Sequence, residues 1–334
     1  MTDGVISAIG NTPLIELKRF FEAPHFRVFA KLDSLNPGGS TKDRPARTII
    51  ESAIRAGLIG PRTVVVESSS GNMGIGLSQI CRYYGLRFIC VIDPKTTAQN
   101  VRLLQAYGAE IELVTEPHRE SGEFLQARIE RVQSLLKEVK NAFWPNQYCN
   151  YDNALAHHGT MHEIFSALDG KLDYMFCATS TCGTLRGCAD YIRRRALNTK
   201  LIAVDAVGSV IFSGQKRKRL IPGHGAAIRP GLYEDYLADD CVHVSDLECV
   251  IGCRRLALRE AVLAGGSSGA VLVAVDRYRN RILKNTTCAV LLADRGERYL
   301  DTIYSDEWVF EHFGNVSAYW QEPASEGSWS AAVS

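Results

Sequence analysis

Short segments that are apolar at every position alternate along this chain with amphipathic helical segments, and this alternation restricts the possible folds most. A strand that is apolar throughout, instead of at every second position, is typical of a parallel sheet covered by helices on both faces. The sequence therefore predicts an α/β fold built from parallel sheets. The expected strands are residues 28–32, 63–67, 87–92, 110–114, 175–178, 201–204, 241–244 and 288–292. The main expected helices are residues 44–56, 73–84, 99–107, 124–140, 154–167, 247–264 and 268–283.

The size and charge of the chain indicate how many domains it forms and which kinds of partner it does not bind. With 334 residues, 46% of them hydrophobic, it can bury a large core and is expected to divide into two domains. A net charge of +1 gives no broad field that would attract nucleic acid or a membrane surface, so we expect neither as a partner. The first residues lack the basic and then apolar order of a signal peptide, and no apolar run reaches the ~20 residues that cross a bilayer.

The cysteines and histidines give no pattern of a metal site. Ten cysteines are scattered along the chain, and none forms a Cys-x-x-Cys pair. That spacing favours neither zinc nor a disulfide framework, so we expect reduced thiols, a cytoplasmic protein and no metal. His157, His158 and His162 could place two imidazoles on one helix face, but no acidic third ligand is evident, and we expect them on the surface.

Lys42 lies in the segment NPGGSTKDR at 36–44, at the start of an expected helix. A helix N-terminus presents free N–H groups and a positive potential, which favour a neutral amine over an ammonium. A neutral lysine amine can attack a carbonyl carbon and form a Schiff base. Most lysines are solvated surface charges, so Lys42 gains weight only from the other motifs of the chain.

Three loops rich in serine and glycine stand where parallel sheets bind ligands, before the start of a helix. In the first, residues 67–74, hydroxyls and an amide at a helix start can bind a carboxylate without a charged side chain. In the second, residues 180–184, backbone N–H groups and two threonine hydroxyls can hold a phosphate. The third is residues 265–269. Each loop alone is more often a simple turn or cap. Together with Lys42, the set suits pyridoxal phosphate acting on an amino acid.

The chain resembles the fold-type II pyridoxal-phosphate enzymes, which share the tryptophan synthase β-like fold and include cysteine synthase and cystathionine β-synthase. The matching motifs occur in the family's order over about residues 4–310. They are IGNTPL at 9–14, Lys42-Asp43-Arg44, Ser70-Gly71-Asn72, Gly183-Thr184, GSSG at 266–269 and GERYL at 296–300.

The resemblance implies a domain organisation. It implies two three-layer α/β/α domains with the cofactor in the cleft between them. Residues 1–40 and 146–312 would form the larger, cofactor-binding domain. Residues 41–145 would form a smaller, mobile domain that carries Lys42 and the loop Ser69–Asn72. Residues 313–334, which lack periodicity, are expected to be a disordered tail.

The resemblance also implies roles for single residues. Lys42 would hold the cofactor and then remove the α-proton of the substrate, while Asn72 would bind the pyridine 3′ oxygen and Ser267 would face the pyridine nitrogen. The phosphate would be held by Ser180, Thr181, Cys182, Gly183 and Thr184, although Cys182 stands where the family usually has a smaller residue. The carboxylate of the first substrate would be bound by Ser69, Ser70, Gly71 and Gln147.

Within the family, the chain is most similar to a siderophore-pathway branch that makes N-(2-amino-2-carboxyethyl)-L-glutamate. Cysteine synthases have a serine and an aromatic residue where this chain has Asp294-Arg295, and a threonine where it has Met73. Both departures point away from sulfide as the nucleophile. Arg128 and Arg295 are candidates to bind a dicarboxylate, with Tyr148 as a polar gate. Arg128 could instead belong to a solvated helix face.

The reaction implied is a β-replacement in which O-phospho-L-serine loses phosphate and the amine of L-glutamate takes its place. The resemblance further implies a homodimer and an NAD-dependent oxidative hydrolase that releases L-2,3-diaminopropionate for a siderophore or antibiotic. Two alternatives stay open on the sequence. One is a cysteine synthase that uses sulfide with O-acetylserine or O-phosphoserine, and the other is a catalytically idle relative that serves as a binding partner. The intact Lys42 and Asn72 count against the idle relative.

Overall fold

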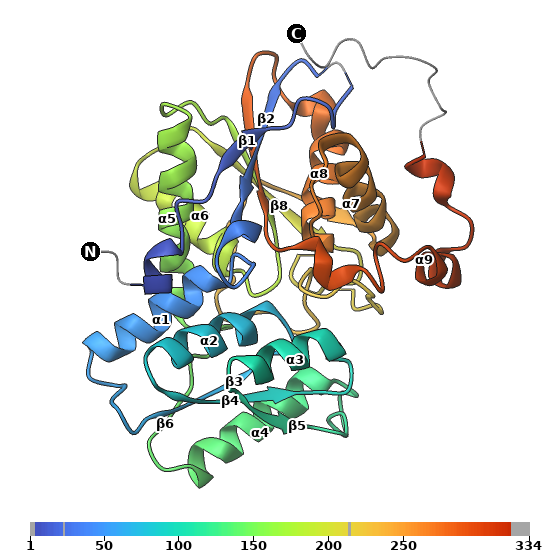
Figure 1. Ribbon diagram of the computed structural model, residues 1–334. Coiled ribbons are helices and arrows are strands. Elements are labelled where there is room, and N and C mark those ends of the chain that lie inside the picture. Colours follow the sequence, from blue (N-terminus) through green and yellow to red (C-terminus); the bar gives the residue numbers. More distant parts are fainter. Residues whose placement is uncertain (1–3, 23, 213–214, 322–334) are drawn as a thin grey trace.

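The computed structural model describes residues 4–22, 24–212 and 215–321. The larger of its two sheets has six strands in the order β1-β2-β10-β7-β8-β9 (Figure 1). These strands are Leu14–Glu16, Arg27–Leu32, Thr287–Leu292, Tyr174–Ala178, Lys200–Ala206 and Asp240–Val244. Neighbouring strands are parallel except at one edge, where β1 pairs with β2 in antiparallel register.

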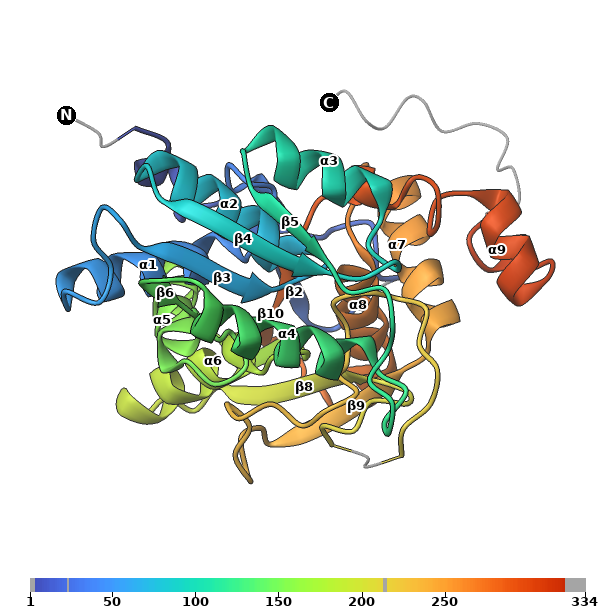
Figure 2. The same ribbon diagram turned by 90° about the horizontal axis from the view of Figure 1, so that it is seen from below.

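The smaller sheet has four parallel strands in the order β5-β4-β3-β6, and Figures 1 and 2 show it beside the larger one. These strands are Glu110–Leu113, Arg87–Ile92, Val64–Ser68 and Ala142–Phe143. Strand β3 is buried at every position, which agrees with a sheet covered on both faces.

Helices cover both faces of each sheet. Alternate residues of β3 show this directly, because Val65 packs with α1, α2 and α3 whereas Val64 and Val66 pack with α4. In the larger sheet, one face packs against α7 and α8 and the other against α5 and α6. The helices are α1 Asp43–Arg55, α2 Asn72–Tyr83, α3 Ala98–Ala106, α4 Phe124–Glu138, α5 Tyr151–Ala167, α6 Gly183–Arg194, α7 Asp246–Glu260, α8 Gly266–Tyr278 and α9 Asp306–Phe313. Short 3-10 turns are Gly4–Ala8, Asp33–Leu35, Arg279–Arg281, Gly296–Tyr299 and Ser317–Tyr319.

The predicted α/β class with mainly parallel sheets is therefore confirmed, and each expected strand and helix is present within a few residues of its predicted bounds. The antiparallel edge strand β1 and the two-residue strand β6 were not predicted, because segments of two or three residues carry no periodicity. Residues 313–321, predicted to be part of a disordered tail, include a 3-10 turn and Trp320, which is 8% exposed beneath Arg254. The rest of that predicted tail lies outside the described residues.

A buried ionic cluster fixes the start of α1 and thus the segment that carries Lys42. The Arg44 guanidinium pairs with Asp33 (Nε to Oδ2, 2.9 Å) and with Glu163 of α5 (Nη1 to Oε1, 2.7 Å). Thr12 donates to Asp33 at 2.7 Å, so the IGNTPL segment packs against the same cluster. Because a buried charge is costly without its partners, these contacts hold the start of α1 against α5.

Candidate active site

A cavity of about 990 Å³ lies between the two sheets and is lined by residues of both. Apart from Arg295, every residue to which the sequence analysis gave a catalytic, cofactor or substrate role lines this cavity. They are Lys42, Ser69, Ser70, Gly71, Asn72, Arg128, Gln147, Tyr148, Ser180, Thr181, Cys182, Gly183, Thr184 and Ser267. Segments as distant in sequence as residues 42 and 267 thus meet at one place, although the roles themselves stay predictions.

Four helices begin at the cavity: α1, α2, α6 and α8. The residues just before the first three, Lys42, Gly71 and Cys182, occupy N-cap positions without a side-chain cap among the described residues, and Gly265 does so for α8. In α1 the first N–H groups donate to the Ser40 and Thr41 carbonyls at 3.3 Å, and in α2 the Gly74 N–H donates to Ser69 Oγ at 2.9 Å. Other first-turn N–H groups of α2, α6 and α8 can bind a ligand, and the four helix dipoles add a positive potential. The cavity is built to receive anionic groups.

Lys42 occupies the N-cap of α1 and points its charge into this cavity. Burial lowers the pKa of its amine, and the negative charge of Asp294 opposes that shift. A lowered pKa raises the fraction of neutral amine, which is the nucleophilic form. The structure thus gives Lys42 the electrostatic setting expected of an amine that reacts with a carbonyl.

The phosphate loop is shaped by Cys182 and Gly183. Cys182 adopts a left-handed conformation with φ of 63° and is 2% exposed. Gly183 follows it, and a Cβ there would collide with the Asn153 amide. Asn153 is itself held by donating to the Gln147 carbonyl at 2.7 Å and to Thr181 Oγ1 at 3.2 Å. The backbone therefore approaches α5 closely and leaves the N–H groups of the loop facing the cavity.

His157 was predicted to lie on the surface, and that prediction is wrong. Its side chain is 0% exposed, because α5 packs against α6 at this point. Its Nδ1 lies 3.2 Å from Thr160 Oγ1, and its Nε2 lies 3.2 Å from Thr184 Oγ1. Burial and nearby cations lower the imidazole pKa well below its usual value, so the ring is neutral. His157 therefore supports the phosphate loop through its contact with Thr184.

The carboxylate loop is held in place by its own hydrogen bonds. Ser69 Oγ accepts from the Gly74 N–H at 2.9 Å, and the Asn100 amide donates to the Ser70 carbonyl at 3.0 Å. Gln147 reaches the loop from the other side, where its Nε2 donates to the Ser68 carbonyl at 3.2 Å. These contacts leave the N-terminus of α2 open towards Lys42.

Asn72 is part of a polar network that the sequence analysis did not predict. Its Nδ2 donates to Asp294 Oδ2 at 2.8 Å, and its Oδ1 accepts from the Arg298 guanidinium. Tyr299 donates its hydroxyl to Asp294 Oδ2 at 2.5 Å. The only sequence signal was indirect: Asp294 was noted as a departure from the family, and Arg298 and Tyr299 lie in the GERYL motif.

Arg128 lies in the cavity and not on a solvated helix face. The residue is 8% exposed, and its Nε lies 3.2 Å from Asp93 Oδ2. Its Nε and Nη1 have no hydrogen-bond partner among the described residues. Buried guanidinium N–H groups normally find acceptors, so this side chain can bind a ligand carboxylate by donating hydrogen bonds to it.

Glu67 is a buried carboxyl group close to Arg128. It is 2% exposed and accepts hydrogen bonds from Trp144 Nε1 at 3.0 Å and from the backbone N–H of Gln147 at 3.1 Å. Burial raises the pKa of this carboxyl group to about 7, while Arg128 and the hydrogen bonds act in the opposite direction. Glu67 therefore binds the Trp144–Tyr148 segment by hydrogen bonds and interacts with the charge of Arg128.

Arg295, the other candidate for binding a dicarboxylate, is exposed and donates to the Ser34 carbonyl at 3.0 Å, and it does not line the cavity. The mouth instead carries the basic segment Lys216–Arg219. In total eight cationic side chains face the cavity, against three carboxylates. The cations are Lys42, Lys95, Arg128, Lys216, Arg217, Lys218, Arg219 and Arg298, and the carboxylates are Asp93, Glu123 and Asp294.

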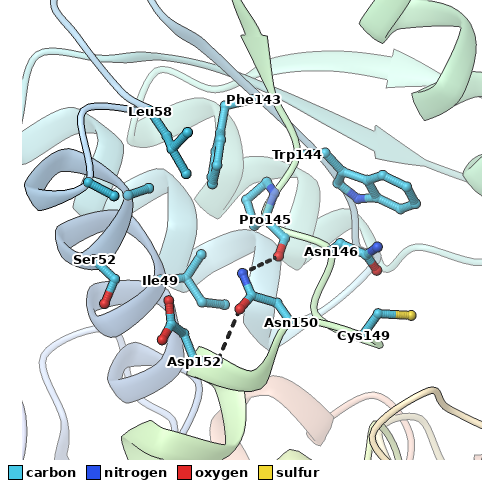
Figure 3. A pocket seen from close by; sticks show the side chains of 12 residues that line it. Ile49, Ser52, Leu58, Phe143, Trp144, Pro145, Asn146, Cys149, Asn150 and Asp152 are labelled. Carbon is cyan, nitrogen blue, oxygen red and sulfur yellow. Dashed lines mark hydrogen bonds between the residues drawn. The ribbon is translucent and has the colours of Figure 1, made fainter.

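A second, smaller hollow of about 410 Å³ lies between α1 and the segment 143–150 (Figure 3). The same segment contributes Gln147 and Tyr148 to the larger cavity. Among the residues that line the hollow, Asp152 alone is charged. Figure 3 shows the Asn150 amide turned towards the Pro145 carbonyl, to which it donates at 3.0 Å. The hollow offers no set of reactive groups comparable to that around Lys42.

The residues present fit the cofactor that the sequence analysis expects. A phosphate would find the uncapped N-terminus of α6, with Gly183 and the Thr184 hydroxyl, and an aldehyde would find the buried amine of Lys42. Ser267, 9% exposed in the first turn of α8, offers a neutral hydroxyl. No helix in the described part of the chain is long and apolar enough to cross a membrane.

Comparison with known proteins gives a consistent result. The family model described as pyridoxal-phosphate dependent enzyme matches residues 5–294. A relative in Ralstonia nicotianae, named N-(2-amino-2-carboxyethyl)-L-glutamate synthase, is 47% identical over 91% of this chain and 90% of its own length. A relative of the same name in Cupriavidus metallidurans is 44% identical over 92% of this chain and 91% of its own length. The solved structure of a hydrogen sulfide-producing enzyme from Fusobacterium nucleatum is 33% identical, with a TM-score of 0.84 over 90% of this chain and 100% of that one.

Proposed function

The chain belongs to the family of pyridoxal-phosphate dependent enzymes, and from that premise we propose that it joins O-phospho-L-serine to L-glutamate. The products are N-(2-amino-2-carboxyethyl)-L-glutamate and inorganic phosphate. The observation that carries the proposal is the 44–47% identity, over more than nine-tenths of the chain, to two relatives that bear the name of this synthase. The fold is that of the fold-type II enzymes, and the protein is an enzyme with pyridoxal phosphate as its cofactor.

The charge of the cavity supports anionic substrates. Eight cationic side chains face it against three carboxylates, and two of those carboxylates, Asp93 and Glu123, are already paired with Arg128 and Lys216. O-phosphoserine and glutamate each carry net negative charge, so the excess of cations favours both over neutral competitors. Sulfide needs no such arrangement, because it has no carboxylate to be bound.

When bound, pyridoxal phosphate supplies an electron-withdrawing ring that acidifies the α-C–H bond of an amino acid. We propose that Lys42, released from the cofactor by the substrate amine, takes the α-proton. Phosphate then leaves from the β-carbon, the glutamate amine forms the new C–N bond there, and Lys42 returns a proton to the α-carbon. Lys42 suits both transfers because burial lowers the pKa of its amine.

The other residues bind and orient. We propose that the N-terminus of α2, with Ser69, Ser70, Gly71 and Gln147, holds the carboxylate of the first substrate. Arg128 would then bind a carboxylate of glutamate through its unpartnered Nη1, with Tyr148 beside it. The neutral Ser267 would leave the pyridine nitrogen without a proton, which favours loss of the β-substituent over transamination. These assignments are proposals that rest on the placement of each side chain in the cavity.

The basic segment at the mouth bears on the leaving group. Arg219 donates to the His224 carbonyl at 2.8 Å, but its buried Nε has no partner among the described residues. A phosphate carries more charge than an acetate and gains more from such cations. The segment therefore supports O-phosphoserine over O-acetylserine as the first substrate.

Paired substrates test the proposal. The holoenzyme is incubated with O-phosphoserine or O-acetylserine, each together with glutamate or with sulfide, and products are identified by mass spectrometry while phosphate release is followed. We expect N-(2-amino-2-carboxyethyl)-L-glutamate from O-phosphoserine with glutamate as the fastest product. Faster formation of cysteine from sulfide would establish the cysteine synthase alternative instead.

The proposal extends to the setting of the reaction. We propose that the enzyme is a cytoplasmic homodimer and that its product serves siderophore or antibiotic biosynthesis. The product is a secondary amine that joins two amino acids, so a following oxidative cleavage of the glutamate C–N bond would release L-2,3-diaminopropionate. An NAD-dependent oxidative hydrolase would perform that step. Size-exclusion chromatography with light scattering tests the dimer.

A further inference from the structure

Asp294 is a buried carboxylate beside the proposed catalytic lysine, and none of the roles assigned above uses it. It lies two residues after β10 and is 2% exposed. Its Oδ2 accepts from Asn72 Nδ2 at 2.8 Å and from the Tyr299 hydroxyl at 2.5 Å, while its Oδ1 has no partner among the described residues. Its carbonyl accepts from the Gly265 N–H at 3.2 Å, and a Cβ at Gly265 would collide with the carboxylate. The carboxylate is therefore fixed in place.

Asp294 and Arg298 together determine which way the Asn72 amide points. Arg298 donates to Asn72 Oδ1 and also to the Gly38 carbonyl. A reversed amide would place its oxygen against the Asp294 carboxylate and its NH₂ group against the guanidinium, so only one orientation is favourable. In that orientation one N–H of Asn72 is bound to Asp294, and the second remains free for a ligand in the cavity.

Asp294 also acts on Lys42. Ser40 and Asp294 pair in an antiparallel bridge and the Thr41 N–H donates to the Ala293 carbonyl at 2.7 Å, so Asp294 lies beside the segment that carries Lys42. Its charge raises the pKa of the Lys42 amine, against the lowering by burial. The other groups that face the pair are cationic or neutral near pH 7, apart from Asp43. Lys42 faces the Cys182 thiol and the His157 imidazole. Asp294 faces Tyr299, Tyr304 and Cys253. Arg298 lies next to Asn72, and Asp43 lies next to Arg298. Burial raises the pKa of Cys253 to about 12 and that of Asp43 to about 7.

We propose that Asp294 is a positioning residue that orients the Asn72 amide towards the cofactor and supplies the negative charge that stabilises a proton on the Lys42 nitrogen. A serine, which the resembling cysteine synthases carry at this position, could accept a hydrogen bond but would lack the charge. The proposal rests on the cofactor of the family and not on the choice of substrates. A proton on that nitrogen increases the electrophilic character of the carbon to which it is bound, so Asp294 prepares the holoenzyme for the incoming amino acid.

A spectroscopic titration without substrates tests the proposal. The absorbance of the bound cofactor is followed from pH 5 to pH 10 in the wild-type holoenzyme and in the variants Asp294→Asn and Asp294→Ser. Loss of the charge should lower the midpoint of the titration by about one pH unit in both, which is about a tenfold weaker binding of the proton. Asp301→Asn is the matched control, since Asp301 is exposed, and its midpoint should not move.

Cofactor affinity, measured by equilibrium dialysis, provides the second readout. Both Asp294 variants should bind pyridoxal phosphate more weakly because the Asn72 amide is no longer held, and loss of binding with an unchanged circular dichroism spectrum would support the same conclusion. Unchanged midpoints in variants that still bind the cofactor would overturn the proposal. Because no amino acid is added, these results do not depend on whether glutamate or sulfide is the second substrate.

Discussion

The two walls of the active-site cavity are built in different ways. On the side of the six-stranded sheet, the phosphate loop at 180–184 presents backbone N–H groups and small side chains, and its close contacts depend on glycine, as at Gly183 against Asn153. That side also carries the charged side chains of Lys216–Arg219 and Arg298 nearer the mouth, whereas the wall from the four-stranded sheet carries Lys95 and Arg128. The phosphate loop has one shape, whereas the long charged side chains can change their partners by rotating.

This difference suggests how one fold can serve many reactions. A cofactor phosphate is the same in every turnover, so rigid backbone donors suit it. Nucleophiles differ in size and charge from one family member to another, so their recognition falls to side chains that can be exchanged without altering the backbone. Changes in the phosphate loop should therefore affect every reaction of the enzyme, and changes in the charged side chains of the four-stranded side should affect the choice of nucleophile. The predictions below test that division.

The largest effect is expected at Lys42, which stands where the two walls meet. Lys42→Ala removes the amine that would bind the cofactor and carry the α-proton, so turnover should fall by at least about a thousandfold, and the visible absorbance of the lysine-bound cofactor should disappear. Absorbance spectra and product formation are measured on the same preparation. Lys171→Ala is the control, because Lys171 is exposed. Lys31→Ala would not serve, because Lys31 belongs to the buried ionic cluster with Glu163. Turnover near the wild-type rate in Lys42→Ala would remove this residue from the mechanism.

The second effect tests the phosphate loop. In Gly183→Ala the new methyl group would collide with the Asn153 amide, which is held by Gln147 and Thr181. Overpacking of this kind costs about 1–3 kcal/mol, so the affinity for pyridoxal phosphate should fall by about tenfold to a hundredfold. Equilibrium dialysis gives the affinity, and rates are then compared at saturating cofactor. Gly60→Ala, at an exposed position without a positive φ where no atom lies within 4 Å of the new Cβ, controls for the loss of a glycine. A cofactor affinity equal to that of the wild type would contradict the picture of a phosphate loop with one shape.

The third effect tests the charged side chains of the four-stranded side. Arg128→Ala should raise the apparent KM for glutamate by about tenfold, because a hydrogen bond to a charged group contributes about 1.5–3 kcal/mol and Asp93 already offsets part of the charge. Release of phosphate from O-phosphoserine in the absence of glutamate should change little. The two half-reactions are followed by a phosphate assay in single-turnover experiments.

Two matched variants sharpen the result at Arg128. Arg131→Ala removes a guanidinium from the same helix, but that side chain pairs with Glu112 and Glu138 outside the cavity, so both half-reactions should be preserved. Arg128→Lys keeps a charge against Asp93 but loses the planar fork and should be intermediate. If phosphate release and glutamate use fall together in Arg128→Ala, this charged side chain is not specific for the nucleophile.

The sequence was sufficient to predict the parts of this enzyme that depend on local pattern. Strands such as β3 and β4 contain uninterrupted apolar runs, at 64–66 and 88–92, because both of their faces are covered, and that pattern is visible without a structure. The loops at 67–74 and 180–184 were found because each run of glycine and hydroxyl residues follows an expected strand and precedes an expected helix, where parallel sheets bind ligands. The resemblance to a family then brought these separate loops together at Lys42.

The residues that were missed depend on contacts between distant segments. His157 was predicted to be on the surface because no acidic third metal ligand was evident beside it, yet it is buried where α5 meets α6. The bond between Asn72 and Asp294 joins residues 222 positions apart, and nothing in either local sequence indicates it. Arg295 was a candidate because Asp294-Arg295 replaces the serine and aromatic pair of cysteine synthases, but its side chain donates to the Ser34 carbonyl outside the cavity.

The last effect is on stability and not on turnover, and it concerns Glu67, a buried carboxylate close to Arg128. Its pKa is about 7 in the folded protein, raised above the usual value of 4.5 mainly by burial. Between these two values the folded state binds more protons than the unfolded state, so the free energy of unfolding should fall as the pH rises from 4.5 to 7, by up to about 3 kcal/mol from this group. Glu67→Gln removes the titration and keeps an acceptor for Trp144, and should lack this component. Urea unfolding at pH 5, 6, 7 and 8 with saturating cofactor measures it. Asp43, whose pKa is also about 7, contributes to both proteins and cancels in the difference between them. A difference between variant and wild type that is constant over this range would show that Glu67 stays charged, and that Arg128 is held by two carboxylates and not by one.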